Sequence, residues 1–160
     1  MSESASAQLV QTSTMGDELD KQESALIASV MTVKQLKDGE VLVKEGQNEE
    51  SLFLLVHGTL TVTTNHDSVD EVVYTMKPGE CAGTRAFVDR APRKATLKAS
   101  GDATVYCMTP EDFESLLDNY PKVVYKVMRA IFRITHANLM RMNQEKEQLS
   151  NYINKTHGRY

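Results

Sequence analysis

Four cationic side chains lie close together in the segment 83–96, within a part of the chain that is otherwise acidic. Arginine presents a planar fork of N–H donors that matches the oxygens of a phosphate. Glycine lets the backbone approach a bound group closely, and the first amides of a helix point outward at an anion. The segment is therefore a candidate anion-binding loop, and its cations are Arg85, Arg90, Arg93 and Lys94.

The candidate loop combines backbone and side-chain donors. Gly83 precedes a predicted single helical turn over 84–88, and Arg93 follows a proline that sets the direction of the chain. The amides that open the helical turn would face the anion, those of Thr84, Arg85 and Ala86. The residues alone leave an alternative open, in which Thr84 only caps the turn and the cations are solvated.

The elements around this loop have the pattern of a mainly β domain. Between residues 32 and 109, short runs rich in Val, Leu, Thr, Tyr and Phe are separated by glycines. The turns recur about every 8 to 12 residues and no long crossover helix intervenes, which predicts an antiparallel sandwich or roll. The runs are VKQLKDGEVLVKEG, SLFLLVHGTLTVTT, DEVVYTM, KATLKA and ATVYCM.

Helices are predicted on both sides of the β roll, within a single domain over residues 17–157. Residues 1–16 are small and polar without periodicity, so we expect them to be disordered. Residues 17–31 suit a short amphipathic helix that follows Asp17. Residues 110–157 are predicted to be helical, because Thr109 and the following proline form a helix start and a second long helix begins at Pro121.

The long helix carries a heptad pattern of apolar side chains over about four repeats. A helix of this length exceeds what one small roll can bury, so we expect a homodimer through residues 121–157. The alternative is a helix that folds back entirely on its own roll. The heptad positions are Tyr125, Met128, Phe132, Thr135, Leu139, Met142, Lys146, Leu149 and Ile153.

The charge is distributed unevenly along the 160 residues, whose net charge is −4. Residues 1–120 hold ten basic and twenty acidic side chains, whereas residues 121–160 hold eight and two. We expect the basic helix to complement the acidic body, with nucleic acid or a membrane surface as the alternative partner. No secretory signal or apolar span of about 20 residues is visible, which predicts a cytoplasmic protein without a membrane segment. In that compartment Cys81 and Cys107 are expected to be reduced.

Three segments resemble the cyclic nucleotide-binding domain family, which includes catabolite-activator-type regulators, cyclic-nucleotide-dependent kinases and gated channels. The resemblance extends over residues 33–153. It implies a double-stranded β-helix, or jelly roll, followed by a long dimerisation helix. The implied ligand is cyclic AMP or cyclic GMP, and no cofactor is required. The segments are DGEVLVKEGQNEESLFLLVHGTLTV and two that are similar to the phosphate-binding cassette of the family, PGECAG and APRKAT.

The resemblance assigns roles to individual residues of the cassette. Arg93 would bind the phosphate, Gly83 would allow the close approach, and Lys94 adds a neighbouring cation. Ala86 and Ala95 would supply backbone amides. Further along the chain, Asn138 would lie near the base, where it could bond a base edge or serve only to set the helix register.

Two positions depart from the pattern of the family. Thr84 stands where the family has a glutamate that binds the ribose 2′-hydroxyl. Losing a charge-assisted bond costs about 1.5–3 kcal/mol, so cyclic AMP binding should be weakened about ten- to a hundredfold. Arg85 replaces an inward-facing Leu or Ile, and burial of an unpaired guanidinium is costly. We therefore expect Arg85 to meet an acid, an anionic ligand or solvent.

The function expected from these patterns is a stand-alone sensor module that binds an anionic nucleotide and signals through its helix dimer to a partner protein. The alternative is a degenerate interaction module that keeps the fold without a ligand. Direct sequence-specific DNA binding is not expected, because only seven residues follow Ile153 and no recognition helix is visible. An enzyme is not expected either, since the four histidines form no cupin-like metal cluster and nothing specific supports a haem sensor.

Overall fold

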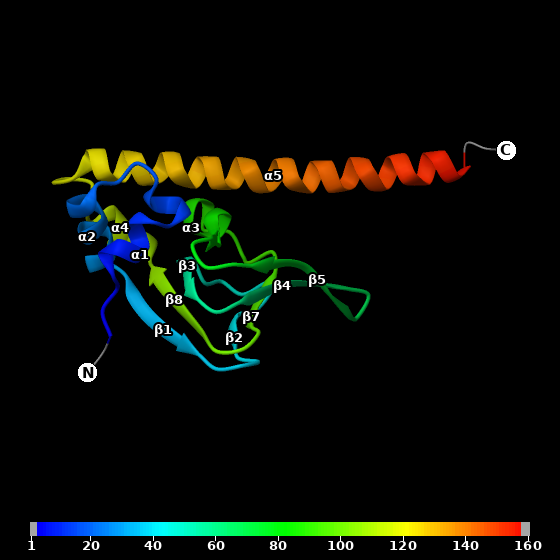
Figure 1. The fold of residues 1–160 in the computed structure, drawn as a ribbon, viewed down its shortest axis with the longest axis horizontal. Helices are drawn as coiled ribbons and strands as arrows, with labels where there is room; N and C mark the ends of the chain where they lie inside the picture. The colour runs from blue at the N-terminus through cyan, green and yellow to red at the C-terminus, as the bar shows by residue number, and fades with distance from the viewer. Residues whose placement is uncertain (1–2, 158–160) are drawn as a thin grey trace.

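The computed structural model describes residues 3–157, with the side chains described as far as residue 154. Eight strands form two antiparallel four-stranded sheets, in the orders β1-β8-β3-β6 and β2-β7-β4-β5. The chain therefore has the expected jelly roll, with helices at one side and a long C-terminal helix across the top (Figure 1). The strands are β1 (Thr32–Leu36), β2 (Val41–Val43), β3 (Leu52–His57), β4 (Leu60–His66), β5 (Val69–Met76), β6 (Cys81–Ala82), β7 (Thr96–Ala99) and β8 (Ala103–Met108).

Successive side chains of β3 point to opposite faces of its sheet and so contribute to two different hydrophobic cores. Leu52 and Leu54 pack with the helices on the outer face of the first sheet. Phe53 and Leu55 point the other way, into the core between the two sheets. The run LFLLV is apolar throughout because successive side chains of a strand face opposite sides, and here both sides are buried.

The N-terminal segment differs from its prediction. Residues 1–2 lie outside the described residues, but residues 3–16 are ordered rather than disordered and form α1 (Ala7–Gln11) and η1 (Thr14–Gly16). Val10 and Met15 are fully buried in the core beside the first sheet. The backbone N–H of Thr14 donates to the carbonyl of Gly79 at 2.9 Å. The prediction was wrong because the few apolar residues of this segment give no periodic signal, although Val10 and Met15 are buried by distant parts of the chain.

Helix α2 (Lys21–Ser29) lies within the predicted range but begins later than expected. Its N-cap is Asp20 rather than Asp17. The Asp20 side chain accepts a hydrogen bond from the backbone N–H of Glu23, and the Glu23 side chain accepts one from the backbone N–H of Asp20. This reciprocal capping box satisfies two backbone donors and sets the helix start.

The predicted C-terminal helices are present. Helix α4 (Pro110–Glu114) is capped by Thr109, and α5 (Pro121–His157) runs for 37 residues. The first half of α5 packs on the core through Val123, Val127 and Ile131, and the second half extends over the β roll (Figure 1). None of the helices within the described residues is both long enough and apolar enough to cross a membrane.

Ion pairs join the N-terminal segment to α5. Glu18 contacts Arg129 and Arg133, both at 3.2 Å, and Glu23 contacts Lys126 at 2.9 Å. The expectation that the basic helix complements the acidic body is therefore confirmed for these three cations. The pairs help to hold the first half of α5 in place, since that half carries the charges nearest to α2.

Candidate functional site

Gly83 and Arg93 lie against each other, as the sequence predicted. Gly83 has φ +83°, a left-handed conformation that favours glycine, and it immediately precedes α3 (Thr84–Asp89). A Cβ atom added at Gly83 would lie 1.9 Å from Nη1 of Arg93. The absence of a side chain at this position therefore makes room for the guanidinium.

The Arg93 side chain is buried but incompletely paired. Its residue is 5% exposed, and Nη2 donates to the backbone carbonyl of Ser51 and, at 3.3 Å, to the carboxylate of Glu49. The guanidinium also lies 4.7 Å from the centre of the Phe53 ring. Nε and Nη1 are buried and have no hydrogen-bond partner. Burial lowers the pKa of Arg93 from its ordinary value, and the Glu49 charge opposes this shift.

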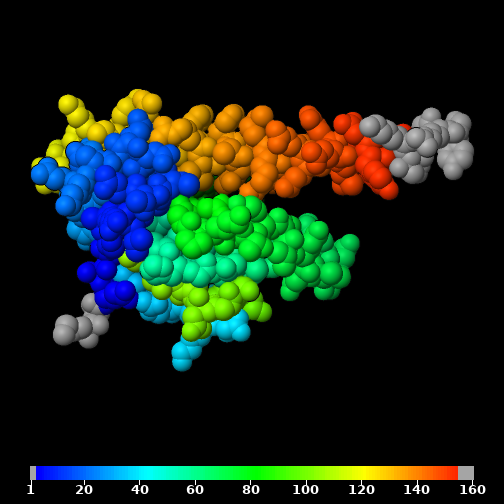
Figure 2. Space-filling view, in the orientation of Figure 1, coloured from blue at the N-terminus to red at the C-terminus, as the bar shows by residue number. Residues whose placement is uncertain are grey.

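A large cavity opens beside this guanidinium. Its volume is about 860 Å³, and it is bounded by the cassette segment 82–86 and 92–95, by β4 and β5, and by the second half of α5. Figure 2 shows the hollow between the distal part of α5 and the β4–β5 hairpin. Thr64 of β4 also lines the cavity, and its buried hydroxyl has no partner. Buried polar groups without partners are uncommon, and here two side chains that line one cavity contain them.

Helix α3 connects the cassette to α5. Thr84 is buried, and its hydroxyl forms a 3.0 Å hydrogen bond with the hydroxyl of Thr135 on α5. The Thr135 hydroxyl also lies 2.9 Å from the carbonyl of Ile131. The turn-capping role that the residues alone left open for Thr84 is not observed, because Gly83 is the N-cap of α3 and no side chain makes a capping hydrogen bond there. The Thr84 hydroxyl instead bonds a residue 51 positions away in the sequence.

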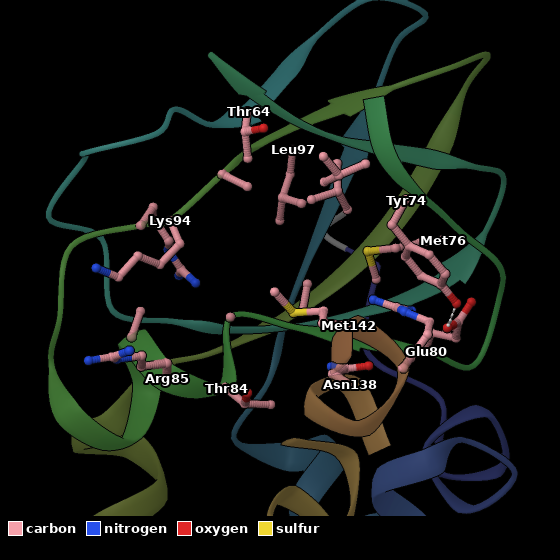
Figure 3. A pocket seen from close by; sticks show the side chains of 18 of the residues that line it. Thr64, Tyr74, Met76, Glu80, Thr84, Arg85, Lys94, Leu97, Asn138 and Met142 are labelled. Carbon is pink, nitrogen blue, oxygen red and sulfur yellow. Dashed lines mark hydrogen bonds between the residues drawn. The ribbon is translucent and has the colours of Figure 1, made fainter. Parts of the chain in front are cut away.

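The remaining predicted site residues line the same cavity. Ala86 and Ala95 belong to the cassette side, and Asn138 belongs to the α5 side. Arg85 lies at the rim with its side chain 65% exposed, and its only ion pair within the described residues is a 3.9 Å contact with Asp89. It therefore meets solvent and a distant acid, which avoids the cost of burial. Lys94 is exposed at the same end of the cavity (Figure 3).

A second polar cluster, which no sequence pattern predicted, lies at the opposite end of the cavity. The Tyr74 hydroxyl donates to the Glu80 carboxylate, and the Arg141 guanidinium lies 3.9 Å from the centre of the Tyr74 ring. The hydrogen bond to Glu80 and burial raise the pKa of Tyr74. The three residues come from β5, from the turn before β6 and from α5. Their types gave no motif, and only the meeting of α5 with the hairpin brings them together (Figure 3).

Other chemistry-bearing residues form no further site in the part of the chain that the structure describes. No group of three or more His, Cys, Asp or Glu side chains there could hold a metal ion. Cys81 is buried, Cys107 is half-buried, and both are free. Burial raises the pKa of each thiol to about 11, so both side chains are neutral near pH 7.

Comparisons with known proteins agree with this architecture. The family model for the cyclic nucleotide-binding domain matches residues 33–120. The cAMP-dependent protein kinase regulatory subunit of Mycosarcoma maydis is 28% identical over 85 residues, which are 53% of this chain and 16% of that protein. Lysophospholipase NTE1 of Eremothecium gossypii is 25% identical over 114 residues, which are 70% of this chain and 8% of that protein. The chain thus spans less than a fifth of the length of these curated relatives.

A solved structure shows the same fold. The chain superposes on a cyclic nucleotide-binding domain from Methylobacillus flagellatus KT with a TM-score of 0.83 at 17% identity, covering 91% of this chain and 86% of the other. The likeness includes the jelly roll and its helices. With the family model matching more than half of its residues, the chain belongs to the cyclic nucleotide-binding domain family.

Proposed function

We propose that this chain is a cytoplasmic sensor module that binds a cyclic nucleotide, or a related anionic nucleotide, in the cavity beside Arg93. The observation that carries the proposal is the buried guanidinium of Arg93, whose Nε and Nη1 have no partner. A phosphate at this position would accept hydrogen bonds from these nitrogens and balance their charge. Leaving them without a partner costs free energy, so ligand binding would relieve a cost that the free protein bears.

The second half of α5 is the element that would respond to the ligand. It lines the cavity through Asn138, Arg141 and Met142, among others, and Thr135 bonds Thr84 of the cassette. A ligand that contacts both the cassette and α5 would favour one position of the helix. The equilibrium between helix positions would shift only by the difference in the ligand's affinity for those positions.

The same helix would carry the signal through a homodimer. Seven of its nine heptad positions are large apolar residues, and all seven are exposed. A straight α-helix drifts about 20° per heptad from a 3.5-residue repeat, so this exposed seam runs obliquely around α5. Two of its members, Met142 and Leu149, also line the cavity. Ligand binding and dimer contacts would therefore involve common side chains, and the altered dimer surface would be recognised by a partner protein.

Relatives of this chain support a regulatory role without a reaction of its own. One is a kinase regulatory subunit whose name refers to cAMP. Another is a lysophospholipase of which this chain spans only 8%. We infer that this domain regulates activities that reside in other domains or other proteins.

Thermal melting of the full chain with excess cyclic AMP or cyclic GMP tests the proposal. A ligand at 100 times its Kd stabilises the folded state by about 2.7 kcal/mol, which corresponds to a rise in Tm of about 5–10 °C for a domain of this size. Arg93→Met, which keeps much of the side-chain volume, should abolish the rise. Lys98→Ala, which removes an exposed cation of β7 outside the cavity, should retain it.

The absence of a rise in Tm would contradict the sensing proposal. If none of the nucleotides raises Tm while the folded chain remains a dimer, sensing is excluded for these ligands. The chain would then be a degenerate dimeric interaction module. An Arg93→Met variant that responds as the parent does would show that Arg93 is not the phosphate ligand.

A further inference from the structure

The cassette end of the cavity holds more positive charge than one phosphate requires. Arg93 lines the cavity and lies against Gly83. Arg85 and Lys94 lie together at the cassette end of the cavity (Figure 3). The Arg85 side chain is 65% exposed, with only Asp89 at 3.9 Å to balance it. Lys94 takes part in none of the ion pairs found among the described residues. Two cations beyond Arg93 are therefore free to bind an anion.

The carboxylates that line the cavity are fewer than its cations, and Glu80 lies away from the cassette end. Five cations line the cavity but only two carboxylates, those of Glu80 and Glu145. Glu80 lies beside Tyr74, at the end away from Arg85 and Lys94 (Figure 3). It already accepts hydrogen bonds from the Tyr74 hydroxyl and from the backbone N–H of Lys77. The lining is thus positively charged in a chain whose net charge is −4.

The charge of a cyclic mononucleotide matches only part of this arrangement. Its phosphodiester carries one negative charge, which the unpartnered nitrogens of Arg93 can bind. Lys94 would then remain without a counter-charge, and Arg85 would have only its exposed 3.9 Å contact with Asp89. The cavity is also large, since its volume of about 860 Å³ is near the upper end of the range of about 300–1,000 Å³ for ligand pockets. A ligand with a second phosphate would match both the charge and the space.

From this excess we infer that the ligand of the cavity is a nucleotide with two separate phosphate groups, of the cyclic dinucleotide class. One phosphate would lie against Arg93 and Gly83, and the second would lie between Arg85 and Lys94. The inference rests on the proposed function, because it names the ligand class of the same site. It also gives a reason why Arg85 and Lys94 occur in a cassette that has Thr84 where the family has a glutamate.

Calorimetric titration of the full chain tests the inference with defined probes. Cyclic di-AMP and cyclic di-GMP are compared with cyclic AMP and cyclic GMP, and adenosine 3′,5′-bisphosphate provides two phosphates without the closed ring. We expect at least one two-phosphate probe to bind about tenfold more tightly than either mononucleotide, as one extra charge-assisted contact allows. Its affinity should also fall more steeply with salt. If the bisphosphate binds more tightly than both cyclic dinucleotides, the result would support a ligand with two phosphates and contradict the requirement for a closed dinucleotide ring.

Variants test the contribution of Arg85 and Lys94 to ligand affinity separately from that of the rest of the site. Replacement of both Arg85 and Lys94 by alanine should lower the ratio of two-phosphate to mononucleotide affinity about tenfold. Lys98→Ala, an exposed cation outside the cavity, should leave the ratio unchanged. Because Arg85 and Lys94 are exposed, the ligand-free Tm of the double variant should equal that of the parent, which checks its folding.

Failure of this inference differs from failure of the proposed function. If cyclic AMP or cyclic GMP binds as tightly as every two-phosphate probe, and the double variant keeps the ratio, the inference is overturned and the sensing proposal stands. If no probe binds the folded parent chain, both are overturned.

Discussion

At the scale of single residues, the site depends on the contact between Gly83 and Arg93. The glycine provides a left-handed backbone and an open space, and the guanidinium fills that space. The bonds to Ser51 and Glu49 hold Nη2, and Nε and Nη1 are buried without a hydrogen-bond partner in a residue that lines the cavity. If Arg93 binds the phosphate as proposed, its guanidinium already occupies the binding position before any ligand enters.

Substitution of Gly83 tests this contact through stability. Gly83→Ala places a Cβ in a left-handed conformation and 1.9 Å from Nη1 of Arg93. Gly39→Ala is a matched control, because Gly39 has φ +82° and open space around the added Cβ. The control should lose about 1–2 kcal/mol from backbone strain alone, and Gly83→Ala should lose about 1–3 kcal/mol more from overpacking.

Urea denaturation of the two glycine variants measures the difference. A double-mutant cycle with Arg93→Met isolates the contact, since removal of the guanidinium should recover much of the extra loss. Equal losses for Gly83→Ala and Gly39→Ala would mean that the guanidinium moves aside freely. The guanidinium would then not be fixed in its position before a ligand binds.

At the scale of elements, Arg90 fastens α3 to α4. It ends α3 with φ +55°, and its guanidinium contacts Glu50 and Glu111, both at 2.8 Å, and Glu114 at 3.3 Å. Glu111 and Glu114 belong to α4. The cassette helix is thus held at its start by Thr84 and α5, and at its end by Arg90 and α4.

The Arg90 contacts predict a pH dependence. The hydrogen bond from Arg90 lowers the pKa of Glu111 from its ordinary value of 4.5. A carboxylate whose pKa is lower in the folded state stabilises the fold above its unfolded pKa, and this contribution is lost as pH falls through the folded value. Arg90→Gln should therefore lower Tm at pH 7, and the difference from the parent should shrink below pH 4.5.

Scanning calorimetry between pH 7 and pH 3 measures this difference. Arg85→Gln is the control, because the Arg85 side chain is 65% exposed and its ion pair within the described residues is a 3.9 Å contact with Asp89. Such an exposed pair contributes little to stability, so its small Tm difference should not vary with pH. A parent-minus-Arg90→Gln difference that stays constant from pH 7 to pH 3 would contradict the pairing with Glu111.

At the scale of the whole molecule, α5 connects three parts of the chain. Its first half is fastened to the N-terminal segment by the pairs of Glu18 and Glu23. Its second half covers the cavity, and the Arg141 to Tyr74 contact ties it to the β4–β5 hairpin. The large apolar side chains at the heptad positions of α5 are exposed on the isolated chain, and this exposure is the basis of the proposed dimer.

Leu139 lies on that seam and provides the test of the proposed dimer. Its side chain is exposed on the isolated chain, so Leu139→Glu should leave the fold intact and place a charge in the dimer interface. Sedimentation velocity should show a dimer for the parent and a monomer for the variant. Met140→Glu, one position along and off the seam, should remain dimeric. A Leu139→Glu dimer of undiminished affinity would refute the predicted register.

Local pattern was sufficient for much of the fold and part of the site. Period-two runs predicted seven of the eight strands, and β6 was missed because two residues give no period. The proline and threonine signals located α4 and α5. The cassette turn and the convergence of Gly83 with Arg93 followed from their spacing and from the family resemblance.

Tertiary structure decided what depends on contacts between distant residues. Val10 and Met15 are buried only once the first sheet and its helices have formed. Arg93 likewise meets Glu49, Ser51 and Phe53 only in the folded chain. The cluster of Tyr74, Glu80 and Arg141 requires both the β4–β5 hairpin and α5 to be in place. The sequence by itself determined elements, because helix and strand periods are properties of neighbouring residues. It left these contacts open, because a side chain carries no local record of which remote surface will bury it, so only packing shows which charges stay unpaired.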